Sequence, residues 1–376
     1  MSRAPKQPLR LTGKRVFICA GAGGVGKTTS AAAIALGLAA EGRRVAVVTI
    51  DPAPRLATAL GLGALDNEPR RVPSRRLAAH GVELRGELWA MKLDPKRTFD
   101  ELVDRLAPSE RRRDEVLDNH IYRELSTAVA GSHEFAAVAK LYELDRAGGY
   151  EAIVLDTPPS RNALDFISAP ARLTALFEAR TLGMLRLAPA GRAAALATRV
   201  MGRGAAGLFA VLRRVTGVDL LGEMSNFFGA LAEVLDGFNE RAGGVARLLR
   251  DEATAFVLVS SPERESVDEA IAFAAELRAE SMPLGGVIVN RVHLEAPEVA
   301  AASQNAALAA LSRPLGKQLA AKVIENLEDV RVLVRRDRKA VARLEAALGE
   351  LVLVPHLAGD VHDVAGLARV TGHLFG

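Results

Sequence analysis

The stretch GAGGVGKTT, residues 21–29, follows an apolar run at 15–20 and precedes an alanine-rich segment at 30–41. It fits the pattern G-x-x-x-x-G-K-[ST], whose fixed positions are Gly21, Gly26, Lys27 and Thr28. Glycines let the backbone wrap closely and point N–H groups at phosphate oxygens, and the following helix adds the positive end of its dipole. Strand, loop and helix in this order predict a phosphate-binding loop.

The residue types in this loop suit a nucleoside triphosphate with Mg²⁺. We expect Lys27 to neutralise the β- and γ-phosphates during catalysis, and the Thr28 hydroxyl to bind the metal ion. A glycine-rich turn that matches the pattern by chance is the alternative, but it would not need a strand before it and a helix after it. The other loop residues expected at the nucleotide are Gly21, Gly23, Gly24, Val25, Gly26 and Thr29.

Short apolar runs rich in β-branched residues recur along the chain, separated by helical stretches. Continuous apolar runs are typical of strands covered on both faces, and their alternation with helices predicts a doubly wound, mostly parallel α/β sheet of about seven to eight strands. One of the helices, at 266–276, is expected to open with a capping box formed by Ser266 and Glu269. The predicted strands are 15–20, 45–50, 88–93, 152–155, 255–260, 286–290 and 351–354.

Long stretches without a strand pattern interrupt this alternation. Two of them flank the fourth predicted strand, so we expect them to form one helical subdomain inserted into the P-loop core. A third polar helical insert, at 294–350, precedes the last strand. The predicted division is residues 10–94, 147–164 and 251–376 for the core, and 95–146 and 165–250 for the helical subdomain.

Composition narrows the class of protein. The chain has 376 residues, with 49 Lys and Arg against 45 Asp and Glu, a net charge of +4. The basic residues are spread among acidic ones, so nucleic-acid binding is not expected. The single cysteine, Cys19, excludes a disulfide framework and is expected to be a small core residue. A polar N-terminus and the lack of an apolar run of ~18 residues predict a cytoplasmic protein.

Two aspartates end predicted strands. Asp51 is expected to position or activate the attacking water; the alternative is an aspartate that caps a turn before Pro52. Asp156 follows the run AIVL, a Walker-B arrangement that binds Mg²⁺ directly or through water. The candidate catalytic residues are therefore Lys27 and Asp51, and the candidate metal site is Thr28, Asp51 and Asp156.

Several segments together resemble one family. The chain resembles the anion-transporting ATPases, a deviant P-loop class whose loop reads GKGGVGKT and which includes the arsenite-pump ATPase and the eukaryotic ATPase that targets tail-anchored membrane proteins. The resemblance implies ATP and Mg²⁺ as ligands and a nucleotide-bridged dimer. The matching segments are GAGGVGKTT (21–29), TIDPAPRL (49–56), AGSHEF (130–135), VLDTPPSRNALDF (154–166), VIVNRV (287–292) and VPHLAGDVHDVAGL (354–367).

Site roles follow from this resemblance position by position. It implies that Asp51 belongs to switch I and orients the hydrolytic water, and that Asp156 belongs to switch II in the magnesium shell. Asn290 matches the family asparagine that hydrogen-bonds adenine, and the segment after Pro355 matches the loop over the base. Without the resemblance, Asn290 is equally explained as a cap at a strand end.

Three departures from the family pattern affect the expected mechanism. Ala22 replaces a lysine that reaches across the dimer to the partner's nucleotide, so either another cation such as Arg161 replaces it or a paralogue brings the lysine; we favour the paralogue. The cysteines for arsenite or a bridging zinc are absent. The switch II stretch reads SRN at 160–162, where the targeting ATPase has Thr-Gly-His.

An apolar stripe in the predicted helical subdomain has two interpretations, and one of them is a binding site for a client protein. Core packing explains it, and the alternative is a groove for an apolar segment of a client protein. We favour a Mg²⁺-dependent ATP hydrolase that acts as a homodimeric or heterodimeric switch for a hydrophobic or membrane-protein client. Its expected location is the cytoplasm, either free or peripheral to the inner membrane. The alternatives are a regulatory positioning-type ATPase and an ATPase subunit of an anion efflux system. The stripe consists of Leu221, Met224, Phe228, Leu231, Leu235 and Phe238.

Overall fold

An eight-stranded sheet forms the centre of the computed structural model, which describes residues 9, 11–119, 122, 132–157, 242–293, 304–357 and 359–375. The strand order is β3-β4-β2-β5-β1-β6-β7-β8, and all neighbours are parallel except β3 and β4. This arrangement confirms the predicted fold class. The strands are β1 (Val16–Ala20), β2 (Arg44–Thr49), β3 (Arg70–Arg71), β4 (Glu87–Lys92), β5 (Ala152–Asp156), β6 (Thr254–Ser260), β7 (Leu284–Val292) and β8 (Val352–Pro355).

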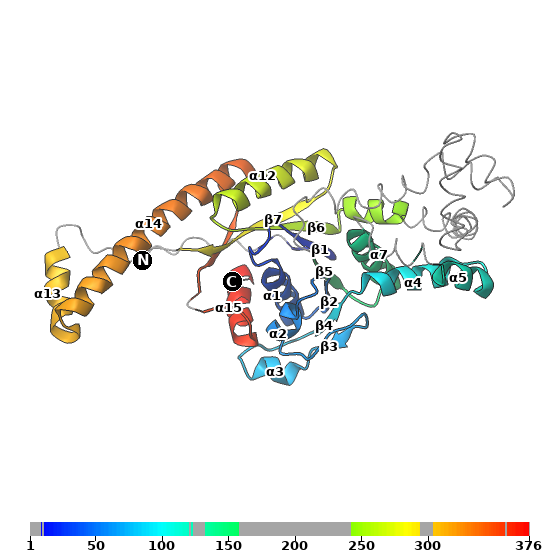
Figure 1. Cartoon of the computed structure of the whole chain (residues 1–376), viewed down its shortest axis with the longest axis horizontal. Coiled ribbons are helices and arrows are strands. Elements are labelled where there is room, and N and C mark those ends of the chain that lie inside the picture. The colour runs from blue at the N-terminus through cyan, green and yellow to red at the C-terminus, as the bar shows by residue number, and fades with distance from the viewer. Residues whose placement is uncertain are drawn as a thin grey trace, which may run out of the picture.

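One face of the sheet is covered by α1 (Lys27–Ala40), α2 (Arg55–Ala59) and α15 (Val364–Phe375), as Figure 1 shows. The ring of Phe375 lies over Gly37, where a β-carbon would overlap it. α15 therefore packs into the core. The short helix α3 (Ser74–Ala78) lies between β3 and β4 in the chain.

The opposite face is covered by α7 (Ser132–Ala147), by helical residues 242–250 and by α12 (Arg264–Ala279). The predicted capping box at Ser266 and Glu269 is wrong. α12 begins at Arg264, two residues earlier, and Ser266 is a buried residue of its first turn whose carbonyl accepts a hydrogen bond from Ser260 Oγ at 3.0 Å. The buried position of Ser266 outweighs its capping propensity.

A helical hairpin of α13 (Gln304–Leu315) and α14 (Lys317–Leu348) is inserted between β7 and β8. Figure 1 shows it projecting from one end of the sheet, with α13 against the far end of α14. Near the body, α14 packs on α12 and β7 through the fully buried Leu344. The described residues of this insert are therefore helical, as predicted.

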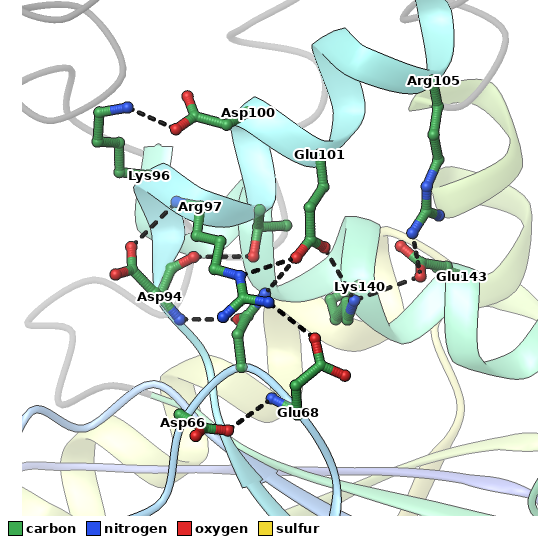
Figure 2. A network of polar contacts seen from close by, with 12 residues as sticks. Asp66, Glu68, Asp94, Lys96, Arg97, Asp100, Glu101, Arg105, Lys140 and Glu143 are labelled. Carbon is green, nitrogen blue, oxygen red and sulfur yellow. Dashed lines mark hydrogen bonds and ion pairs between the residues drawn. The ribbon is translucent and has the colours of Figure 1, made fainter.

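A polar network fastens α4 (Pro95–Leu106) to α7 and to the loop after α2 (Figure 2). The buried Lys140 on α7 pairs with Glu101 of α4 at 3.1 Å and with Glu143 at 3.3 Å. Asn67 donates to the other Glu101 oxygen and accepts from the Asp94 backbone N–H. α4 is therefore fixed at its start, directly after β4; α5 (Glu110–Leu117) follows it.

Part of the predicted helical subdomain lies outside the described residues. This holds for the stripe from Leu221 to Phe238 and for most of 165–250. Arg161, in the predicted core, also lies outside the described residues. Within the described ranges, no helix combines the length and apolarity needed to cross a bilayer.

Candidate functional site

The loop between β1 and α1 has the backbone that its glycines permit. Gly21 has φ 151°, and a β-carbon there would overlap the Val259 carbonyl oxygen of β6. Gly26 has φ 99°, and a β-carbon there would overlap the side-chain amide of Asn290. The loop is thus pressed against the ends of β6 and β7, which a larger residue at either position would prevent.

Lys27 opens α1 and is almost fully buried, with 6% of its surface exposed. Its Nζ donates hydrogen bonds to the carbonyl oxygens of Gly21 at 2.8 Å and Ala22 at 2.7 Å. Burial lowers the pKa of Lys27, the Asp156 and Asp51 carboxylates raise it, and the charge of Arg55 lowers it again. A buried cation with only carbonyl partners is ready to exchange them for a phosphate oxygen.

Asp156 ends β5 behind the loop. Its Oδ2 accepts hydrogen bonds from the Thr28 hydroxyl at 2.7 Å and the Thr49 hydroxyl at 2.8 Å. Its Oδ1 is buried and has no hydrogen-bond partner among the described residues. Burial raises the pKa of Asp156 to about 6, against the two hydroxyl hydrogen bonds, which lower it.

These contacts fit the magnesium ion that the motif implies. A free carboxylate oxygen beside a threonine hydroxyl offers the oxygen ligands that Mg²⁺ prefers, and Mg²⁺ bound to a nucleotide needs only one or two protein ligands. The described residues contain no group of three or more His, Cys, Asp or Glu side chains suited to a metal ion. The fit therefore rests on Asp156 and Thr28, with phosphate oxygens and water completing the shell.

Asp51 follows β2 and is 9% exposed. Its Oδ1 accepts from the Ala53 backbone N–H at 2.9 Å, and its own N–H donates to the Thr49 hydroxyl at 3.2 Å. Its Oδ2 lies 3.4 Å from Nη1 of Arg55, the first residue of α2. Asp51 thus caps a turn, as one of the two sequence interpretations expects, and it also lines the cavity beside the loop. Its action on the attacking water stays a prediction.

A cavity of about 510 Å³ connects these groups at the carboxyl ends of the strands, where open α/β sheets bind ligands. On one side are the phosphate loop and α2; on the other are Asn290, Arg291 and the segment after β8. Of the predicted residues, Gly21, Gly23, Val25 and Asp156 are not part of its wall. Those that line it are Gly24, Gly26, Lys27, Thr28, Thr29, Asp51, Asn290 and Pro355.

Residues at the ends of β7 and β8 link the loop and the cavity to α14. Asn290 donates from Nδ2 to the Val25 carbonyl at 2.8 Å, so β7 supports the phosphate loop. His356 lines the cavity, and its ring stacks on that of His293, with centroids 4.9 Å apart. His293 in turn is held by the fully buried Asp337 of α14, through its backbone N–H at 2.9 Å and Nδ1 at 2.8 Å.

Sequence reasoning missed several residues of this site. Thr49 and Arg55 both lie in the TIDPAPRL segment, so the resemblance to the family pointed to the segment but not to these side chains. His293 and Asp337 have no local signal, because 44 residues separate them in the chain. His356 and His362 both line the cavity, yet the ring contact of His356 is with His293.

Fold and site together define a P-loop nucleotide-binding α/β protein. The family model for the anion-transporting ATPases matches residues 14–333, and the chain belongs to that family.

Three relatives show how far the similarity extends. ATPase GET3 of Malassezia globosa is 29% identical over 159 residues, which are 42% of this chain and 43% of the relative. ATPase ARSA1 of Chlamydomonas reinhardtii is 28% identical over 296 residues, 74% of this chain and 35% of the relative. ATPase GET3C of Arabidopsis thaliana is 28% identical over 290 residues, 74% and 67% respectively. The chain thus spans less than half the length of the first two.

Proposed function

We propose that this protein is a Mg²⁺-dependent ATP hydrolase that works as a nucleotide-driven switch in a dimer and handles a hydrophobic or membrane-protein client. The observation that carries the proposal is the single cavity that Lys27, Thr28 and Asp51 share with Asn290 and Pro355. Membership of the anion-transporting ATPase family supports ATP as the nucleotide.

The chain's own groups divide the binding of ATP between them. Lys27 exchanges its two carbonyl partners for phosphate oxygens, next to the N–H groups at the start of α1. Asn290 and Pro355 face the base across the cavity. Asp156 and Thr28 hold the magnesium ion, which when bound neutralises charge on the β- and γ-phosphates.

Asp51 is the group that prepares the water. Its carboxylate orients the water and accepts its proton while the water oxygen bonds to the γ-phosphorus and the bond to the bridging oxygen breaks, giving ADP and phosphate. Both switch segments are held by contacts to the γ-phosphate of bound ATP. Hydrolysis removes these contacts, so the two switch segments are released.

A chain of contacts leads from this site toward the helical subdomain. Thr49 joins Asp51 to Asp156, and Lys92 at the end of β4 donates to the Pro52 carbonyl at 3.0 Å. Two residues separate the end of β4 from the start of α4, which is tied to α7. Movement of the Asp51 segment on hydrolysis would therefore displace the start of α4. This supports a switch that acts on the predicted helical subdomain, where the client is expected to bind.

Asp51→Asn tests the catalytic part. The amide keeps the acceptor for Ala53 but is a poor base, so turnover should fall by ~100-fold or more while ATP affinity stays within ~3-fold. Phosphate release and calorimetry measure the two. Asp268→Asn, an exposed aspartate of α12, is the matched control and should change neither. Equal loss of binding and turnover would show that Asp51 only supports the loop.

The client part is tested by capture. Asp51→Asn protein held with ATP should retain membrane proteins or hydrophobic segments, and Lys27→Ala protein should not. Retention of DNA or lipid alone would favour the positioning-type regulator instead. Stimulation of wild-type turnover by an oxyanion, without protein clients, would favour an efflux subunit.

A further inference from the structure

The phosphate loop offers only one cation, because position 22 carries no charge and faces inward. Ala22 is 8% exposed and packs with Val25 and Val259 in a small apolar cluster behind the loop. Besides the loop lysine and the magnesium ion, phosphoryl-transfer enzymes of this class use a further positive side chain to stabilise the charge that develops in the transition state. In this chain such a side chain has to come from another part of the cavity.

Arg55 is placed to supply it. It lines the same cavity as Lys27, and its neighbours on α2, Thr58 and Ala59, form the same wall. Its side chain is 67% exposed and pairs with Asp51 at 3.4 Å. Its charge also acts on Lys27, whose pKa it lowers, so the two cations are close enough to act on one anion.

The other arginine of the cavity wall is less suited. Arg291 follows Asn290 near the end of β7, and Asn290 is the residue assigned to the base. Arg55, in contrast, is paired with Asp51, the group assigned to the attacking water.

We propose that Arg55 is a catalytic residue that supplies, within the same chain, the positive charge that Ala22 lacks, and that its ion pair with Asp51 is the resting state of the site. This rests on the proposed ATP hydrolysis. The guanidinium leaves Asp51 for the γ-phosphate when ATP binds, and the freed Asp51 carboxylate takes up the water. Binding of the triphosphate and release of the Asp51 carboxylate from its ion pair therefore occur together.

The direction of this exchange follows from the two partners. An ion pair at 3.4 Å whose arginine is largely exposed contributes little to stability, since water reaches and screens the guanidinium. Guanidinium groups bind phosphate through two parallel hydrogen bonds, which are among the strongest polar contacts in proteins. ADP has no γ-phosphate, so the effect of Arg55 should be specific for the triphosphate.

The test compares Arg55→Ala and Arg55→Lys with Arg264→Ala. Arg264 is a matched control because it too is exposed, begins a helix and pairs with an aspartate four residues away, in its case Asp268 on α12. The full chain is used with Mg²⁺, and three quantities are measured: kcat for ATP, affinity for a non-hydrolysable ATP analogue, and affinity for ADP. A melting curve checks folding, which an exposed side chain should not affect.

Arg55→Ala should lower kcat by ~100-fold or more and weaken the ATP analogue at least ~10-fold, with ADP affinity within ~2-fold. Arg55→Lys should recover part of kcat, and free guanidinium added to Arg55→Ala should recover some as well. Arg264→Ala should match wild type throughout. If Arg55→Ala keeps kcat within ~3-fold, or weakens ATP and ADP alike, the proposal is wrong and Arg55 only anchors the Asp51 turn. If wild type does not hydrolyse ATP, the proposed function fails, and the ratio of analogue to ADP affinity still decides the role of Arg55.

Discussion

At the scale of single residues, Lys27 is buried and donates to two carbonyl oxygens, with no anionic hydrogen-bond partner in the part of the chain that the structure describes. This arrangement can be tested directly. Lys27→Ala removes a charge-assisted contact to phosphate worth ~2–3 kcal/mol, so ATP affinity should fall at least ~30-fold. Calorimetry with ATP measures it. Lys322→Ala, an exposed lysine on α14, serves as control. Unchanged ATP affinity in Lys27→Ala would contradict the phosphate-loop assignment.

Asp156 makes stability depend on pH in a defined direction. Its folded pKa of about 6 lies above the ordinary 3.8, so the folded state favours the protonated carboxyl, and its contribution is lost as pH rises through about 6. Asp156→Asn should therefore raise the melting temperature of the nucleotide-free protein at pH 7.5, by roughly 2–4 °C for about 1 kcal/mol. The gain should shrink toward pH 5.

The same variant should lose what the carboxylate provides. Mg²⁺ with ADP should stabilise wild type more than ADP alone, and this extra stabilisation should be absent from Asp156→Asn. A lower melting temperature for Asp156→Asn at pH 7.5, or an intact magnesium effect, would show that the free Oδ1 atom serves the fold rather than the metal.

At the scale of elements, the contact between α1 and α15 predicts an unusual response to alanine. Gly→Ala within a helix normally stabilises by up to ~1 kcal/mol. At Gly37 it should destabilise, because the new methyl group meets the Phe375 ring. Gly372→Ala in α15 is the control, since a β-carbon there has open space. Chemical denaturation should show opposite signs for the two, and Phe375→Ala should remove the penalty at Gly37.

The strands were predictable because burial on both faces leaves a local signature. β1, β5 and β6 are buried along their whole length, and their continuous apolar sequences predict this burial. β3 consists of two exposed arginines, Arg70 and Arg71, paired antiparallel to β4 at the sheet edge. An edge strand of this kind has no apolar pattern, so the sequence could not predict it.

The site was predictable only where it is contiguous in the chain. Lys27 and Thr28 belong to one motif, whereas the Thr49–Asp156 hydrogen bond joins residues 107 apart and depends on β2 and β5 being neighbours. The strand order that creates this contact is a property of the whole sheet. The same is true of Asp337, which reaches His293 only because α14 returns to the end of β7.

At the scale of the whole molecule, the charge of the lysine missing at position 22 can come from a paralogue or from the chain itself. The two sources differ in the activity that they predict for one chain alone. If a paralogue supplies the lysine, the single chain should hydrolyse ATP slowly and dimerise weakly, and a co-expressed pair should be faster with asymmetric sites. If Arg55 supplies the charge within its own chain, two copies suffice. We expect the second outcome, because Arg55 already lies in the cavity and Ala22 is turned away from it.

Combining variants separates these answers. The unmodified chain, alone, should hydrolyse ATP. The Asp51→Asn variant, alone and with ATP bound, should sediment as a dimer. Ala22→Lys should strengthen that dimer, and in an Arg55→Ala background it should restore part of the lost turnover, because a lysine from the partner copy then neutralises the triphosphate. Turnover that rises only on addition of a lysine-bearing paralogue, with no effect of Arg55→Ala, would establish the paralogue. The activity restored by Ala22→Lys depends on a lysine from the partner copy, whereas Arg55 acts within its own chain. Dilution should therefore abolish the activity of the double variant before it affects the activity of the unmodified protein.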